Sequence, residues 1–192
     1  FMGPLDRDKP WSMQAIEGVY RFLQRAWRIF QEDQADGSAK FLVSEEKPTD
    51  DDLKILHQTI KKVTEDIEGL RFNTAISQLM VFVNHFTKTQ HYPRACLTPF
   101  VQLLHPLAPH AAEELWEMLG QKSELSFAPW PTFDPAIAKE STITIAVQVL
   151  GKTRGTIEVD PEADQKAVEA LALALPSVSA NIQGKAIKKT IY

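Results

Sequence analysis

The stretch from Leu103 to Trp116 constrains the fold more than any other part of the sequence. Pro106 and Pro109 lack the amide hydrogen that a helix interior needs and restrict the residues before them, so a helix arriving from residue 100 must end here. A second helix can restart at once, because apolar residues recur at helical spacing and glutamates occupy the other side. The sequence therefore predicts a kinked helix pair that other helices must cover. Its second helix has an apolar face of Ala111, Leu115, Met118 and Leu119, with Trp116 at the edge.

Length and composition fit a folded protein of one large or two small domains. The chain has 192 residues, of which 44% are hydrophobic. No apolar run approaches the roughly 20 residues that span a bilayer, and the first residues do not resemble a signal peptide. We expect a cytoplasmic domain cut from a longer polypeptide, without membrane contact. The single cysteine, Cys96, excludes an internal disulfide and a Cys-based zinc site, and we interpret it as a buried apolar residue.

Amphipathic repeats predict three helices before the one that ends at the proline break. The first covers residues 12–32, the second 51–68 and the third 73–88, and the helix before the break starts near Arg94. Residues 32–52 are rich in acidic and turn residues and predict a loop. We expect Thr49 or Asp50 to cap the second helix, since no second ligand cluster accompanies Asp50 to Asp52 as a metal site would require. Asn73 is the expected N-cap of the third helix. The expected buried stripe of the first helix is Ile16, Tyr20, Leu23, Trp27 and Phe30.

The composition changes after residue 135. Residues 126–135 hold three prolines and three aromatics, which predicts an irregular strap across the helices. Residues 142–150 and 156–159 alternate apolar and polar side chains as a β-hairpin does. A helix over 163–175 follows, with Val168, Leu171 and Leu175 facing inward and Pro176 ending it, and then a last strand over 186–192. The fold class is thus a mainly α helical bundle, residues 1–135, followed by a small α+β (β-β-α-β) domain, residues 136–192.

Basic residues gather in two places although the formal net charge is −4. Residues 1–135 hold 14 basic and 19 acidic residues, and residues 136–192 hold 7 and 6. Arg21, Arg25 and Arg28 share one side of the first helix. They are either a solvated face, with Arg28 paired to Glu32 and Arg21 to Glu17, or a row of phosphate contacts. In the small domain, the lysines either protect a sheet edge or reach phosphates. The basic residues there are Lys152, Arg154, Lys185, Lys188 and Lys189.

Nothing in the sequence assembles a catalytic or metal site. There is no Gly-rich phosphate loop, no His-Glu-x-x-His motif and no nucleophile with a base, so a free-standing hydrolase is excluded. Two hypotheses stay open. One is an RNA-binding appendage, and the other is a protein-interaction module that docks through the aromatic strap and the acidic loop. Salt separates them, because phosphate binding weakens steeply as salt rises and apolar contact does not.

Several stretches together resemble one family. Residues 17–27, 71–76 and 104–116 look like the anticodon-binding helical bundle of class I aminoacyl-tRNA synthetases for large aliphatic amino acids. Residues 147–154 and the final Ile-Lys-Lys-Thr-Ile-Tyr look like the small C-terminal domain of bacterial-type leucyl-tRNA synthetases. Valyl enzymes resemble a coiled coil in this place, and isoleucyl enzymes often carry a Cys-rich zinc module. One departure is Leu150, where the family usually has Asn before the hairpin glycine, which weakens a type I′ turn.

The resemblance implies that the chain binds RNA and that it carries no catalytic residues of its own. It implies that the chain positions tRNA(Leu) for leucylation, which an absent catalytic domain of the parent synthetase carries out. The parent would be a monomer that uses ATP with magnesium. The fragment itself would need no cofactor. The bundle would contact the anticodon stem and the small domain the outer corner of the tRNA. Base readout of the anticodon would be weak. The expected tRNA-binding residues are Arg21, Arg25, Arg28, Lys152, Arg154, Lys185, Lys188 and Lys189. The alternatives are a protein-interaction helical module or the same region of a valyl or isoleucyl enzyme.

Overall fold

The computed structural model describes residues 3–139, 143–159, 163–182 and 190. The chain is mainly helical and divides into two compact units, residues 1–139 and 140–192. The expected fold class, a helical bundle followed by a small α+β domain, is confirmed. The expected domain limit at residue 135 stays a prediction. Within the described residues, no helix is long and apolar enough to cross a membrane.

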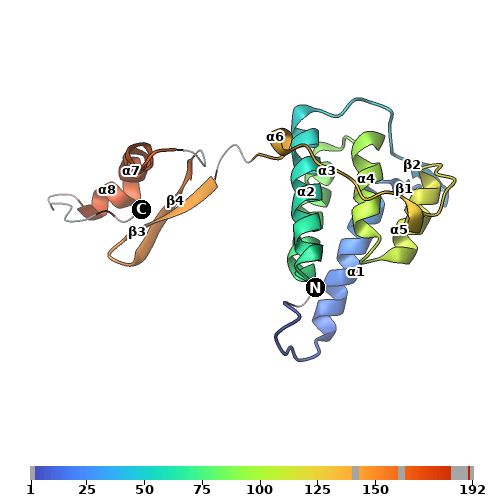
Figure 1. Cartoon of the computed structure of the whole chain (residues 1–192), viewed down its shortest axis with the longest axis horizontal. Coiled ribbons are helices and arrows are strands. Elements are labelled where there is room, and N and C mark those ends of the chain that lie inside the picture. Colours follow the sequence, from blue (N-terminus) through green and yellow to red (C-terminus); the bar gives the residue numbers. More distant parts are fainter. Residues whose placement is uncertain (1–2, 140–142, 160–162, 183–189, 191–192) are drawn as a thin grey trace. The chain divides into compact units, whose positions relative to one another are not determined.

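Unit 1 is a bundle whose helices lie alongside one another, with α2 packed against α3, α4 and the short α6 (Figure 1). Helix α4 stops before Pro106 and α5 starts at Pro109, so the predicted break is confirmed. Its elements are α1 (Met13–Arg28), β1 (Gln31–Asp33), β2 (Ala39–Phe41), α2 (Asp50–Glu68), α3 (Phe72–Thr89), α4 (Arg94–Leu104), α5 (Pro109–Met118), the 3-10 turn η1 (Leu125–Phe127) and α6 (Pro135–Ala138).

Aromatic side chains from three segments form the centre of unit 1. The rings of Phe82 (α3) and Phe100 (α4) stack, with centroids 4.7 Å apart and planes 5° from parallel. Phe86 packs against Phe82 at 4.5 Å, and Phe30 lies 6.3 Å from Phe100. All four rings are fully buried, which makes them a large contribution to the stability of the bundle. Cys96 is buried as expected, and burial raises the pKa of its thiol to about 12, helped by the charge of Asp52.

The predicted buried stripe of α1 is correct at Phe30 but wrong at the start of the helix. Phe22 and Ala26 in α1, with Ile29 and Phe30 just after it, are buried. The side chains of Ile16 and Tyr20 are instead 43% and 61% exposed. Trp27 and Leu23 are partly buried at the edge of the core. Two apolar stripes therefore run along α1, and the one made by Phe22 and Ala26 faces the bundle.

Three smaller predictions in unit 1 were wrong. The acidic stretch after α1 contains the hairpin β1–β2, with Glu32 opposite Lys40, because Asp36, Gly37 and Ser38 close a tight turn. Helix α3 begins at Phe72, so Asn73 lies inside it and Arg71 occupies the N-cap position. In α5, Ala112 is buried and Ala111 only partly, so the buried side is the one that Ala112 shares with Leu115 and Trp116.

Arg71 closes the corner between α2 and α3. Its Nε donates a 2.9 Å hydrogen bond to Oδ1 of the buried Asp66, and its guanidinium also reaches the carbonyl of Glu65 at 2.8 Å. Lys62 pairs with the same carboxylate oxygen at 2.9 Å. Burial alone would raise the pKa of Asp66, but its hydrogen bonds to Lys62, Thr74 and Arg71 outweigh burial and lower it.

The predicted strap lies along unit 1 after η1. The indole Nε1 of Trp130 donates to Oγ1 of Thr64 at 2.8 Å, and the backbone N–H of Asp134 donates to Nδ1 of His57 at 2.9 Å. Both acceptors belong to α2. Phe133 packs against the core, whereas Phe127 is 81% exposed. The strap therefore covers one side of α2 through contacts from residues 130–134.

Unit 2 is built around the predicted hairpin. A bulge between Val147 and Gln148 leaves Arg154 without an opposite residue. The hairpin turn has positive φ at Leu150 (52°) and Gly151 (76°), as a type I′ turn requires, so leucine adopts the conformation that Asn would take more easily. Its elements are β3 (Ile143–Val149), β4 (Lys152–Val159), α7 (Gln165–Ala174) and α8 (Pro176–Ile182).

The small core of unit 2 consists of Ile157, Val159 and Val168. Leu175 packs on it as predicted, but Leu171 is 47% exposed. Helix α7 ends before Pro176 as predicted, and Pro176 itself begins α8. A proline fits the first turn of a helix because its missing N–H is not needed there. Gly155 lies under this junction: a Cβ on it would be 3.1 Å from Leu175 Cδ1. The last strand, predicted over 186–192, falls outside the described residues except for Thr190, which is not in a strand.

Candidate nucleic-acid interface

Three exposed arginines lie on the solvent side of α1. Arg21, Arg25 and Arg28 follow one another at intervals of 4 and 3 residues, which places them on one side of the helix. The buried Phe22 and Ala26 lie about a quarter of a turn around the helix from the arginines, which are all exposed. The sequence-predicted residues of α1 are thus brought together as one basic surface, here called the α1 arginine row (Arg21, Arg25 and Arg28).

The arginine row is not neutralised by the expected acidic partners. The guanidinium of Arg25 donates a hydrogen bond to Oδ1 of Asn84 on α3. No ion pair of Arg21 or Arg28 within 4.0 Å is found among the residues that the structure describes. The pairs Glu17–Arg21 and Glu32–Arg28, which belonged to the interpretation of a solvated face, are therefore not formed, and Glu32 lies in β1. Uncompensated guanidinium groups in water are well suited to phosphate oxygens.

Two further predicted residues lie in the hairpin of unit 2. Lys152 is exposed at the first position of β4, directly after the turn. Arg154 sits at the bulge and is partly exposed, and its carbonyl oxygen accepts a hydrogen bond from the Ser177 hydroxyl of α8. Its Nε is buried and has no partner among the described residues. Lys185, Lys188 and Lys189 lie outside the described residues.

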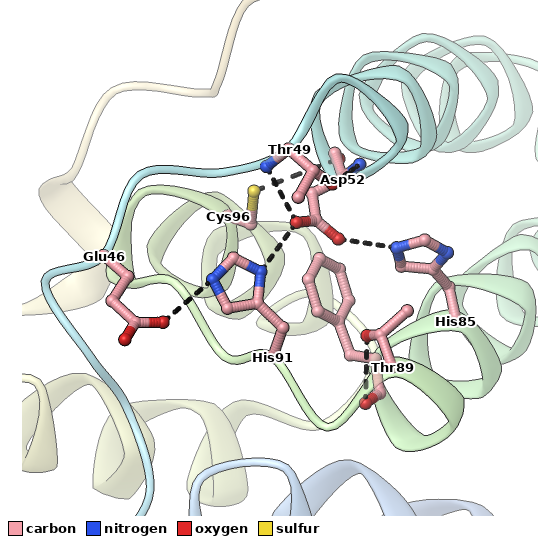
Figure 2. A network of polar contacts seen from close by, with 8 residues as sticks. Glu46, Thr49, Asp52, His85, Thr89, His91 and Cys96 are labelled. Atoms are coloured by element: carbon pink, nitrogen blue, oxygen red, sulfur yellow. Dashed lines mark hydrogen bonds and ion pairs between the residues drawn. The ribbon is translucent and has the colours of Figure 1, made fainter.

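A second polar cluster joins α2, α3 and the segment before α4 (Figure 2). Asp52 is 1% exposed, and its carboxylate accepts hydrogen bonds from His85 Nε2 at 2.6 Å and His91 Nδ1 at 2.8 Å. His91 Nε2 also lies 3.2 Å from Glu46. Burial alone would raise the pKa of Asp52, but hydrogen bonds from His85, Thr49 and His91 outweigh it and lower the pKa to about 2.

Sequence reasoning anticipated only part of this cluster. It placed Thr49 or Asp50 at the helix cap, but it did not connect Asp52 with either histidine. The signal was present in Thr49-x-x-Asp52, a capping box in which each residue's side chain bonds the other's backbone. Such a box fixes Asp52 in the first turn of α2. The cluster has no exposed nucleophile, and within the described part of the chain no group of three or more His, Cys, Asp or Glu could hold a metal ion.

An acidic groove lies around α5 in unit 1. This groove of about 730 Å³ is lined by Glu113, Glu114, Glu117 and Glu124 together with His105. His105 Nε2 lies 3.4 Å from a carboxylate oxygen of Glu113. Carboxylates repel phosphate, so this groove differs in character from the α1 arginine row.

Comparison with known proteins agrees with this architecture. The family model described as the anticodon-binding domain of tRNA ligase matches residues 53–170. A leucine–tRNA ligase of Leptospira biflexa serovar Patoc is 43% identical over 192 residues, which are 100% of this chain and 22% of that protein. One of Corynebacterium jeikeium is 44% identical over 193 residues, 99% of this chain and 20% of that protein. The chain thus spans about a fifth of the length of these curated relatives.

A solved structure shares the fold across nearly the whole chain. It is the ternary complex of Agrobacterium radiobacter K84 agnB2 LeuRS with tRNA and LeuAMS, with a TM-score of 0.66 and 27% sequence identity. The match covers 96% of this chain and 25% of that one. A helical bundle with an exposed arginine row, the matching family model and relatives along the full chain lead to the same assignment: the chain belongs to the family of anticodon-binding domains of tRNA ligases.

Proposed function

We propose that this chain is the tRNA-binding part of a leucine–tRNA ligase, and that it holds tRNA(Leu) while leucylation takes place in another part of the parent enzyme. The observation that carries the proposal is the α1 arginine row, which presents three guanidinium groups to solvent on a unit rich in acidic residues. The relatives' names and the tRNA in the matching LeuRS complex support leucine and tRNA as the substrate classes.

The contacts in this proposal are made mainly to the RNA backbone. The α1 arginine row would contact phosphates of the anticodon stem, because one guanidinium group can donate two hydrogen bonds to the oxygens of one phosphate. These contacts come from Arg21, Arg25 and Arg28. Lys152 and Arg154 at the hairpin tip, with Lys185, Lys188 and Lys189 further along the chain, would contact the outer corner of the tRNA. The chain would contribute orientation, and no described residue would take part in the chemical step.

The parent enzyme in this proposal is a cytoplasmic, monomeric ligase that uses ATP with magnesium. This chain supplies no group for ATP, and its part in catalysis is to fix the tRNA body so that the acceptor end reaches a distant site. Binding energy from a remote contact can lower the barrier of a reaction when it is used to orient the reacting end. Loss of the basic residues should therefore weaken tRNA use without changing amino-acid activation.

The test is the affinity of the 192-residue chain for a tRNA(Leu) transcript, measured by fluorescence anisotropy over a salt series. We expect Kd to rise steeply between about 50 mM and about 200 mM salt. Replacing both Arg21→Glu and Arg28→Glu should raise Kd more than about tenfold and reduce the salt slope by about 2. Lys122→Glu is the control, because it reverses the charge of one exposed residue outside the α1 arginine row. It should alter Kd less than about twofold.

Two outcomes would contradict the proposal. The wild-type chain could fail to bind tRNA at low salt, or binding could be independent of salt, which would indicate an apolar interface and favour a protein partner. Equal losses in the arginine double variant and in Lys122→Glu would show a response to net charge rather than to the α1 arginine row.

A further inference from the structure

A long part of the bundle contains no acidic residue. Residues 69–112 hold no Asp or Glu, although the chain has 25 of them. This stretch includes all of α3 and α4. Because residues 1–135 as a whole carry a net negative charge, the acidic residues are concentrated in other segments. Residues 69–112 therefore contribute no carboxylate that would repel an approaching phosphate.

Helix α3 has its own exposed stripe. Ser77, Asn84 and Lys88 are exposed, and Val81 is 46% exposed. Their spacing of 4, 3 and 4 residues places them on one side of the helix, while Leu79, Phe82 and Phe86 fill the core on the other. Together, Ser77, Val81, Asn84 and Lys88 are called the α3 stripe. It ends with a lysine in the last turn of α3.

The α1 arginine row and the α3 stripe meet at one contact. The Arg25 guanidinium donates to the side-chain oxygen of Asn84, residues 59 positions apart in the sequence. Asn84 is a neutral acceptor, so it holds the guanidinium in place without cancelling its charge. An Asp at this position would hold it equally well but would form an ion pair. The side chain of Arg25 is thus ordered before any ligand arrives, and less conformational entropy is lost on binding.

We infer that the RNA-binding surface continues from α1 onto α3, with Asn84 as the residue that positions Arg25 and Lys88 as an additional phosphate contact. This inference rests on the proposed function and extends it to residues that the family resemblance did not suggest. A purely structural role for Lys88 is the alternative, since a cation in the last turn of a helix interacts favourably with the helix dipole. That role would change the stability of the chain but not its affinity for RNA.

The first experiment compares Lys88→Glu with Lys122→Glu in the tRNA(Leu) anisotropy assay. We expect Lys88→Glu to raise Kd about fivefold or more and to lower the salt slope by about 1, with Lys122→Glu near wild type. Unfolding in urea, followed by tryptophan fluorescence, reports any loss of stability separately. If Lys88→Glu lowers stability and leaves both Kd and the salt slope unchanged, the helix-dipole role is correct and the inference is wrong.

The second experiment is a double-mutant cycle between Arg25 and Asn84. Asn84→Ala should raise Kd about threefold in the wild-type background and have no effect in the Arg25→Ala background, because its role is exerted through Arg25. Asn84→Asp should keep Arg25 ordered yet reduce the salt slope, since the ion pair removes its charge from the interface. Thr87→Ala is the control, as its hydroxyl bonds to Val83 in the same helix.

The results separate this inference from the proposed function. If the Arg21 and Arg28 variants weaken binding while changes at Lys88 and Asn84 do not, tRNA binding stands and the extension onto α3 is wrong. Equal effects of Asn84→Ala with and without Arg25 would also contradict the positioning role. If the wild-type chain binds no tRNA, the proposed function itself fails.

Discussion

Asp52 performs two tasks in the first turn of α2. It completes the capping box with Thr49, accepting from the Thr49 backbone N–H at 2.9 Å, and it accepts hydrogen bonds from His85 and His91. One carboxylate therefore connects the start of α2 with α3 and with the segment leading into α4 (Figure 2). Charge-assisted hydrogen bonds to a buried carboxylate are strong, and each donor would lose its partner if the carboxylate were removed.

Asp52 should make the stability of unit 1 depend on pH in the acid range. Its pKa is lowered from 3.8 to about 2 in the folded chain, so its contribution is fully present above about pH 4 and is lost as pH falls toward 2. Asp52→Asn should lower the free energy of unfolding by about 2 kcal/mol at neutral pH and flatten its pH dependence between about pH 2 and pH 4. Urea unfolding followed by tryptophan fluorescence measures this, since all four tryptophans lie in residues 1–139.

The control for this prediction is the neighbouring carboxylate. Asp51 is exposed in the same first turn, so Asp51→Asn should cost only about 0.5 kcal/mol through the helix dipole. A similar loss in both variants would mean that the histidine contacts of Asp52 contribute nothing to stability.

At the scale of elements, the strap makes a second stability prediction. Phe133 packs against the core beside α2, while Phe127 is 81% exposed at the strap's start. Phe133→Ala should lower the free energy of unfolding by about 1–2 kcal/mol, less than for a fully buried ring. Phe127→Ala should change it by less than about 0.5 kcal/mol. Thermal or urea unfolding of the two variants distinguishes a packed strap from a loose one, for which both changes would be small.

The positions of the bundle helices could be predicted from local signals, but the side that each helix buries could not always be. Proline at 106 and 109 and the Thr49 cap of α2 act within a few residues, so these helix ends were found, whereas the cap predicted at Asn73 was wrong. In α1, the stripe with Ile16 and Tyr20 and the stripe with Phe22 and Ala26 both fit the helical period. Only the neighbouring helices decide between them, and the sequence does not specify how those neighbours are rotated.

The same limit applies to the candidate site. Periodicity placed Arg21, Arg25 and Arg28 on one side of a helix, and in the structure all three are exposed in α1. The contact between Arg25 and Asn84 joins two helices whose facing sides are set by packing, so no local pattern reveals it. The absence of acidic residues from 69 to 112 was readable in the sequence, and it points to the helix that carries Asn84.

For the whole molecule, the arrangement of charge predicts how selective RNA binding should be. Arginine and lysine contacts to phosphates fix orientation and carry no sequence information. A tRNA(Leu) transcript with its anticodon triplet replaced should therefore bind the 192-residue chain with a Kd within about twofold of the unchanged transcript. A DNA duplex of equal length should bind less well, because its grooves and backbone spacing differ from those of A-form RNA.

This prediction is checked by competition between the two transcripts at a fixed salt concentration, with anisotropy of the labelled parent tRNA as the readout. A loss of more than about tenfold on changing the triplet would mean that some side chain reads anticodon bases, contrary to the backbone contacts proposed for the arginine row and the hairpin tip.

The close approach at Gly155 couples two sites of substitution. With Leu175 Cδ1 only 3.1 Å from where a methyl group would stand, an alanine at 155 requires the Leu175 side chain to move slightly away. A glycine-to-alanine change there should cost less stability alongside a shorter residue at 175. Positions 155 and 175 are therefore expected to vary together among relatives. A smaller residue at 175 would accompany a larger one at 155, and the hairpin would keep its contact with the helices.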